Sequence, residues 1–146
     1  MTQSGLAAQI RQVRRQAVFG LADGAMSITG VVLYAAGQHA KVFPYALAGG
    51  VSASLSMAGG EWLSQSDTGL GGAAMMGAAT LAGSLIPALP YLLLTGIAAP
   101  AVAVVLLAAV AALIARMRAH RHHAYLETGA VLAIVLIASA ACAVWL

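Results

Sequence analysis

The sequence predicts an all-α integral membrane protein with five transmembrane helices. Two observations support this prediction: the 146 residues are 62% hydrophobic and only 8% charged, and the few charges are clustered. Soluble domains are about one quarter charged, and about 20 apolar residues suffice for a helix to cross the hydrocarbon core. Uncharged stretches of about that length or more cover residues 68–115 and 128–146. We expect a single membrane domain over residues 1–146.

The apolar runs place the spans, in order, near residues 17–37, 44–64, 71–94, 98–115 and 126–146. The first lies between Arg15 and Lys41, and the second follows after a short connection. The third and fourth divide the long uncharged stretch, because Pro87 and Pro90 break a helix and Pro100 suits the first turn of the next one. The fifth follows a basic loop.

The arginines predict the orientation of these spans. Three arginines precede the first span and three lie between the fourth and fifth, whereas Lys41 alone falls on the other side. Cytosolic loops carry the excess of Lys and Arg. We therefore expect a cytosolic amino terminus, an outer carboxyl terminus and a multi-pass protein of a prokaryotic inner membrane. Because topology accounts for the net charge of +3, we expect no nucleic-acid partner.

Two acidic side chains lie well inside the predicted spans, away from their ends. Asp23 lies eight residues, about 12 Å, beyond Arg15, and Glu61 lies six residues, about 9 Å, before Asp67 at the cytosolic end of the second span. Met57 is four residues from Glu61 and shares its helix face. A hairpin of the two spans would bring all three to one depth.

This arrangement predicts a metal site. A carboxylate in the membrane costs about 2.5–3.5 kcal/mol on insertion scales and needs a proton, a cationic group or a metal ion as compensation. No Lys or Arg lies within the spans. Oxygen from Asp23 and Glu61 with sulfur from Met57 favours Fe²⁺ or Mn²⁺ over Mg²⁺ or Ca²⁺, and the empty carboxylates could take protons in exchange. In the alternative interpretation, a protonated Asp23 bonds to Ser27 and Glu61 reaches water at the interface.

Three motifs in the same order resemble the vacuolar iron transporter (VIT) family. The stretch FGLADGAMSITGVVLYAAG, residues 19–37, is similar to the first span of that family, and VSASLSMAGGEWLSQSD, residues 51–67, to its second. LAGSLIPALPYLL, residues 81–93, is similar to the third span. The chain resembles a short form, because only Gln65–Leu70 stands where many members carry a glutamate-rich metal-binding insert.

The resemblance implies a homodimer in the lipid bilayer that moves Fe²⁺ or Mn²⁺ out of the cytosol in exchange for protons. It also implies that Asp23 and Met57 line the translocation path. Such a protein would contribute to iron and manganese homeostasis as a transporter rather than an enzyme, with the metal as its cargo and no resident cofactor. We expect the dimer to form through small-residue helix faces.

Two further interpretations stay open. The cluster His120, His122 and His123 lies beside arginines in a loop; a basic, orienting loop accounts for it, and a pH-responsive or metal-collecting loop is the alternative. The chain could also be a small helical membrane scaffold or assembly subunit without transport activity. An enzyme is not indicated, because no catalytic constellation or phosphate-binding glycine loop is found in the sequence.

Overall fold

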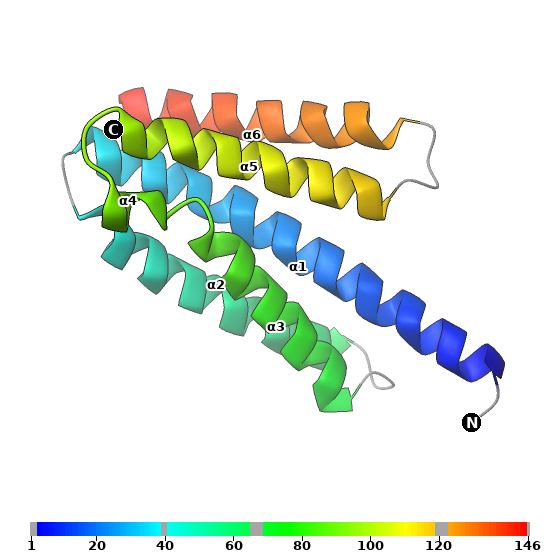
Figure 1. Ribbon diagram of the computed structural model, residues 1–146. Coiled ribbons are helices and arrows are strands. Elements are labelled where there is room, and N and C mark those ends of the chain that lie inside the picture. Colours follow the sequence, from blue (N-terminus) through cyan, green and yellow to red (C-terminus); the bar gives the residue numbers. More distant parts are fainter. Residues whose placement is uncertain (1–2, 39–40, 65–68, 119–122, 146) are drawn as a thin grey trace.

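The computed structural model describes residues 3–38, 41–64, 69–118 and 123–145, and every regular element within these ranges is a helix (Figure 1). The all-α prediction is therefore confirmed. The helices are α1 (Gln3–Gly37), α2 (Val42–Ser64), α3 (Gly69–Leu85), α4 (Pro90–Leu93), α5 (Ala98–Met117) and α6 (Ala124–Trp145).

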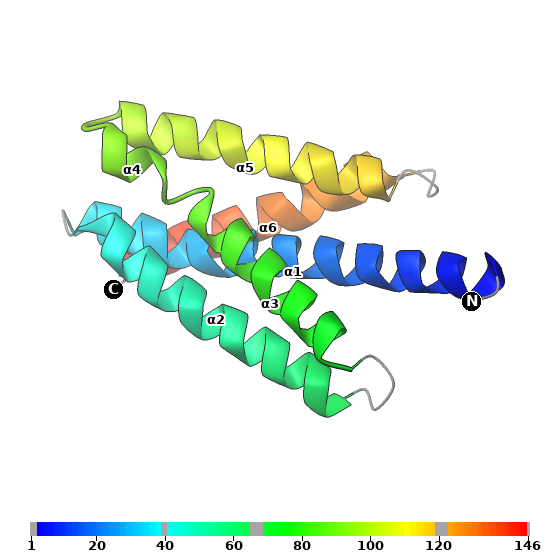
Figure 2. The ribbon, with the colours of Figure 1, turned by 60° about the horizontal axis from the view of Figure 1, so that its bottom comes forward.

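Helix α1 is the central element of the fold. Figures 1 and 2 show it running between the α2–α3 pair on one side and the α5–α6 pair on the other. Its amino-terminal end extends past the ends of the other helices (Figure 1). A residue on α1 can therefore face either helix pair or the open surface between them.

Three helices within the described residues are long and apolar enough to cross a membrane: Ala7–Gly37, Ala98–Met117 and Ala124–Cys142. Leu70–Leu85 is a shorter apolar helix. Length and composition thus support a multi-pass integral membrane protein. The crossing of α2 and α3 and the cytosolic position of the amino terminus stay predictions.

Two helix ends differ from the limits of the predicted spans. The first helix begins at Gln3 rather than near residue 17, because the basic segment before the apolar run continues the same helix. The third ends at Leu85 rather than at residue 94. Pro87 lacks an N–H and disfavours helical geometry in the residue before it, and Pro90 then begins the short α4. Gly96, with φ of 62°, makes the turn into α5.

Glycines hold α1 against α3. A side chain on Gly24 would overlap the backbone carbonyl of Thr80, and one on Gly83 would overlap that of Leu21. The Ser84 hydroxyl also donates to the Gly24 carbonyl oxygen at 3.3 Å. Gly24 and Gly83 thus serve packing within the chain, and a dimer through other small-residue faces stays a prediction.

The α5–α6 pair packs on the other side of α1. Ala25 of α1 forms a buried cluster with Leu107, Val110 and Ile114 of α5. Most described side chains of α6 are exposed, including Cys142. An exposed apolar helix suits a surface that faces lipid.

Candidate metal site on the helical hairpin

The α1–α2 hairpin has a definite register that places the predicted ligands. Gln16 is bonded to Glu61 near one end, and the Ile28 side chain packs against Gly49 nearer the other. The two contacts are twelve residues apart on both helices, forwards along α1 and backwards along α2. The helices are therefore antiparallel, and their register is the same at both contacts. It places Met57 opposite Gly20.

This register puts Met57 and Asp23 within one helical turn of each other. Gly20 precedes Asp23 by three residues, about 4.5 Å along the helix axis. Glu61 pairs instead with Gln16, seven residues and about 10 Å from Asp23. The two acids are therefore about two turns apart along α1, whereas the sequence suggested a common depth.

Glu61 is the most buried of the three predicted ligands. Its side chain is 9% exposed, and its Oε1 accepts a hydrogen bond of 2.7 Å from Gln16 Nε2. Gln16 is itself buried, and its Oε1 has no hydrogen-bond partner among the described residues. An unsatisfied buried amide oxygen is costly, and such atoms in native proteins call for an explanation such as a water molecule or an ion.

Met57 lies on the buried stripe of α2. Gly50 and Glu61 are buried and Met57 is half-buried, at intervals that put all three on one face of the helix. On the same side, the Ser54 hydroxyl donates to the Gly77 carbonyl of α3 at 2.8 Å. Met57 thus points into the bundle rather than to the lipid-exposed side of α2.

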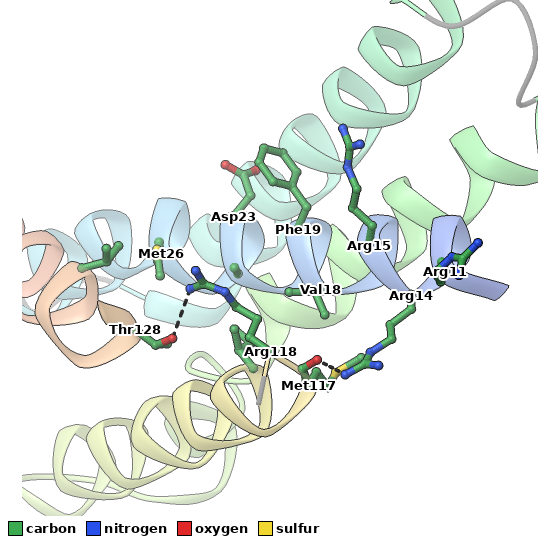
Figure 3. Close-up of a pocket in the computed structure, with 13 residues that line it drawn as sticks. Arg11, Arg14, Arg15, Val18, Phe19, Asp23, Met26, Met117, Arg118 and Thr128 are labelled. Carbon is green, nitrogen blue, oxygen red and sulfur yellow. Dashed lines mark hydrogen bonds between the residues drawn. The ribbon is translucent and has the colours of Figure 1, made fainter. Parts of the chain in front are cut away.

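Asp23 lies on a more open face of α1. It is half-buried, and within the described part of the chain its carboxylate makes no hydrogen bond or ion pair. The Ser27 hydroxyl donates to the backbone carbonyl of Asp23 at 2.5 Å, not to the carboxylate, unlike in the alternative interpretation of the sequence. Figure 3 shows Asp23, Phe19 and Arg15 pointing to the same side of α1.

Two pockets flank this region, and each holds one acid. Asp23 lines a pocket of about 640 Å³ between α1, α5 and α6. Glu61 lines another of about 550 Å³ between α1, α2 and α3. Arg11, Arg15 and Phe19 border both, and Met57 lines neither. One chain therefore does not gather Asp23, Met57 and Glu61 around a single cavity.

Sequence reasoning missed two side chains beside Glu61. Gln16 and Met76 line the Glu61 pocket, and Met76 is buried. Gln16 stands seven residues before Asp23, on the same helix face. The seven-residue spacing from Asp23, together with the register of the hairpin, is the signal that could have identified Gln16 as a neighbour of Glu61.

The histidine loop contributes nothing to this site among the residues described. His120 and His122 lie outside the described residues, and His123 is exposed. No group of three or more His, Cys, Asp or Glu side chains that could hold a metal ion is found in residues 3–38, 41–64, 69–118 and 123–145. A metal held by the described residues of one chain alone would therefore need thioether or amide ligands.

Comparison with known proteins gives one match. No curated protein and no solved structure matched. The model of the VIT family matches residues 14–69, which comprise the apolar part of α1, all of α2 and the connection between them. The matched stretch contains Asp23, Met57, Glu61 and the Gln16 that bonds Glu61. Over residues 14–69, the chain is therefore similar to the VIT family.

Proposed function

We propose that this protein is a membrane transporter for a divalent transition metal ion, Fe²⁺ or Mn²⁺. The observation that carries the proposal is the position of Asp23: a half-buried carboxylate in the middle of a membrane-length helix, with no hydrogen bond or ion pair to any described side chain. Such a group is costly in a bilayer unless an ion or a proton compensates it. The VIT family match covers this helix and the next.

Asp23 and Met57 are the first pair of ligands in this proposal. The hairpin register puts them within about one turn of each other, and Met57 offers a thioether from the buried stripe of α2. A carboxylate oxygen with a sulfur ligand suits Fe²⁺ or Mn²⁺ better than Ca²⁺ or Mg²⁺. Glu61, two turns nearer the arginine-rich end, would receive the ion or a proton before or after this pair.

Gln16 supports transient metal binding at Glu61. Its Oε1 is buried and unpartnered while its Nε2 holds the Glu61 carboxylate. An amide oxygen next to a carboxylate, with the Met76 side chain lining the same pocket, is a donor set that a divalent transition metal can use. Arg11 and Arg15 also line this pocket, and their positive charges disfavour a cation that stays bound there. We therefore propose transient rather than tight binding at Glu61, with the carboxylates returning protons in exchange.

Two copies of the chain would complete the Asp23 site. Asp23 shares the open face of α1 with Phe19 and Tyr34, whose side chains are 55% and 43% exposed. A homodimer that meets along this face would pair two Asp23 carboxylates and remove exposed aromatic surface. This face replaces the glycine face used by α3 as the proposed dimer contact.

Metal tolerance of cells tests the proposed function. Cells that express the protein should survive excess Mn²⁺ or Fe²⁺ better than cells without it, and Asp23→Ala should abolish that protection at equal expression. Glu127→Gln is the matched control, because Glu127 is also an acid but is exposed and paired with Arg118. Equal protection by the wild type and Asp23→Ala would favour the scaffold interpretation instead.

A further inference from the structure

A basic pocket lies between α1, α5 and α6, apart from the Met57 side of the hairpin. It has a volume of about 640 Å³, within the range of small-molecule sites. Apolar side chains from all three helices form its walls, among them Val18, Ile114 and Val131. The pocket follows α1 from Arg11 to Met26, so it has a charged end and an apolar end.

The charged end carries an excess of positive charge. Four arginines line the pocket among the described residues, Arg11, Arg14, Arg15 and Arg118, and Asp23 is the only acid among the described lining residues. Arg11 and Arg15 have no hydrogen bond or ion pair within the described part of the chain. The arginine-lined part of the pocket, on the side away from the Asp23 carboxylate, attracts an anion rather than a divalent cation.

Two of the arginines are held in place by the protein. The Arg14 guanidinium donates to the Met117 carbonyl at the end of α5, and Arg118 donates to Thr128 Oγ1 at 3.4 Å (Figure 3). Arg118 also donates to Glu127 Oε2 at 2.9 Å. Each guanidinium carries five N–H donors, so donors remain for a ligand. Side chains already fixed lose less entropy on binding.

We propose that this pocket binds an anionic phospholipid. Its phosphate lies between Arg14 and Arg118, with Arg11 adding charge, and an acyl chain lies on the apolar wall towards Val131 and Met26. The arginines stand at the ends of α5 and of the apolar part of α1, where a bilayer places its headgroups. Basic pockets between transmembrane helices are a recognised setting for anionic headgroups, and guanidinium groups match phosphate geometry.

The apolar walls distinguish a lipid from a free anion. A soluble phosphate would use the arginines alone and leave Val18, Ile114 and Val131 uncovered, whereas an acyl chain packs against them. Figure 3 shows Asp23 pointing to the side of α1 opposite Arg14 and Arg118. The phosphate therefore does not compete with Asp23 for the same space.

Native mass spectrometry of the purified, full-length protein in detergent tests this proposal, with phosphatidylglycerol and phosphatidylcholine as probes. Each arginine near a headgroup contributes about fivefold in affinity, so replacing two should weaken binding of phosphatidylglycerol about 25-fold. We expect this loss in Arg14→Gln/Arg118→Gln. Arg116→Gln is the matched control, because Arg116 lies at the same helix end and does not line the pocket; it should bind like the wild type.

A second variant keeps the test decisive if the double variant does not fold. Val131→Trp fills the apolar end and leaves every arginine in place, and it should also lose phosphatidylglycerol. Equal binding of phosphatidylcholine, or unchanged binding in Val131→Trp, would overturn the lipid assignment. Displacement of the lipid by glycerol phosphate at similar affinity would also overturn it and would indicate a site for free phosphate. None of these measurements depends on metal transport.

Discussion

Gln16 Nε2 of α1 donates a hydrogen bond of 2.7 Å to Glu61 Oε1 of α2, and both side chains are buried. This bond sets the level at which the two helices of the VIT-like hairpin meet. It separates Glu61 from Asp23 by about two helical turns and leaves Met57 as the closer neighbour of Asp23 along the register.

Removing the amide of Gln16 should destabilise the hairpin. In Gln16→Leu, the Glu61 carboxylate loses a donor while it stays buried, which costs about 1–3 kcal/mol. Thermal unfolding in detergent, followed by circular dichroism, measures the effect. Gln12→Leu is the control, since Gln12 is exposed one turn away, and its midpoint should stay near that of the wild type. Equal midpoints for both variants would show that the bond contributes little.

The close approach of α1 and α3 should not tolerate a side chain at Gly24. Gly24→Val would push its Cβ into the Thr80 carbonyl, which is backbone and cannot move aside alone. Overpacking of this kind costs about 1–3 kcal/mol. Gly37→Val is the control, because no atom lies within 4 Å of a Cβ at that position. Similar expression and melting of the two variants would contradict the helix packing described above.

The thioether of Met57 should matter for metal transport, and that of Met75 should not. Met57→Leu keeps the size of the side chain but removes the sulfur ligand. A loss of about 1.4 kcal/mol of coordination would weaken metal affinity about tenfold. Met75 is 38% exposed on α3 and serves as the matched control for the same substitution. Transport assays at several metal concentrations separate this change in affinity from a change in maximal rate, and equal affinities would remove Met57 from the site.

The proposed dimer should form along the open face of α1. In a Cys142→Ala background, Ser27→Cys should crosslink into dimers in membranes, because Ser27 is exposed one turn from Asp23. Ser56→Cys, an exposed position on α2, is the control and should stay monomeric. Crosslinking at Ser56 but not at Ser27 would move the interface to α2.

The sequence was sufficient for the hairpin and for its similarity to the VIT family, because composition, spacing and a run of motifs all point to membrane helices over residues 14–69. It placed the end of α3 too late, since Pro87 acts on the residues before it as well as on itself. It also assigned the small residues to a dimer contact. Gly24 and Gly83 could equally pack within one chain, and only the three-dimensional structure shows that they do.

The candidate site was predicted less completely than the fold. Counting residues from the membrane boundary gave Asp23 and Glu61 the same depth. That count assumes that Arg15 and Asp67 lie at the same level and that the axes of the two helices are aligned. The bond from Gln16 to Glu61 and the contact of Ile28 with Gly49 give the true register. Gln16 itself has no distinguishing motif, and a polar residue near a basic segment reads as an exposed one until its partner is known.

Metal uptake into proteoliposomes tests the central claim most directly. Vesicles containing the wild type should accumulate Mn²⁺ or Fe²⁺, faster with an opposing proton gradient, and Asp23→Asn should reduce uptake to that of empty vesicles. Asparagine keeps the shape of the side chain but removes the charge that compensates a divalent ion. Uptake by Asp23→Asn at the wild-type rate, in protein that is equally folded and inserted, would contradict the proposal that a divalent ion passes this carboxylate.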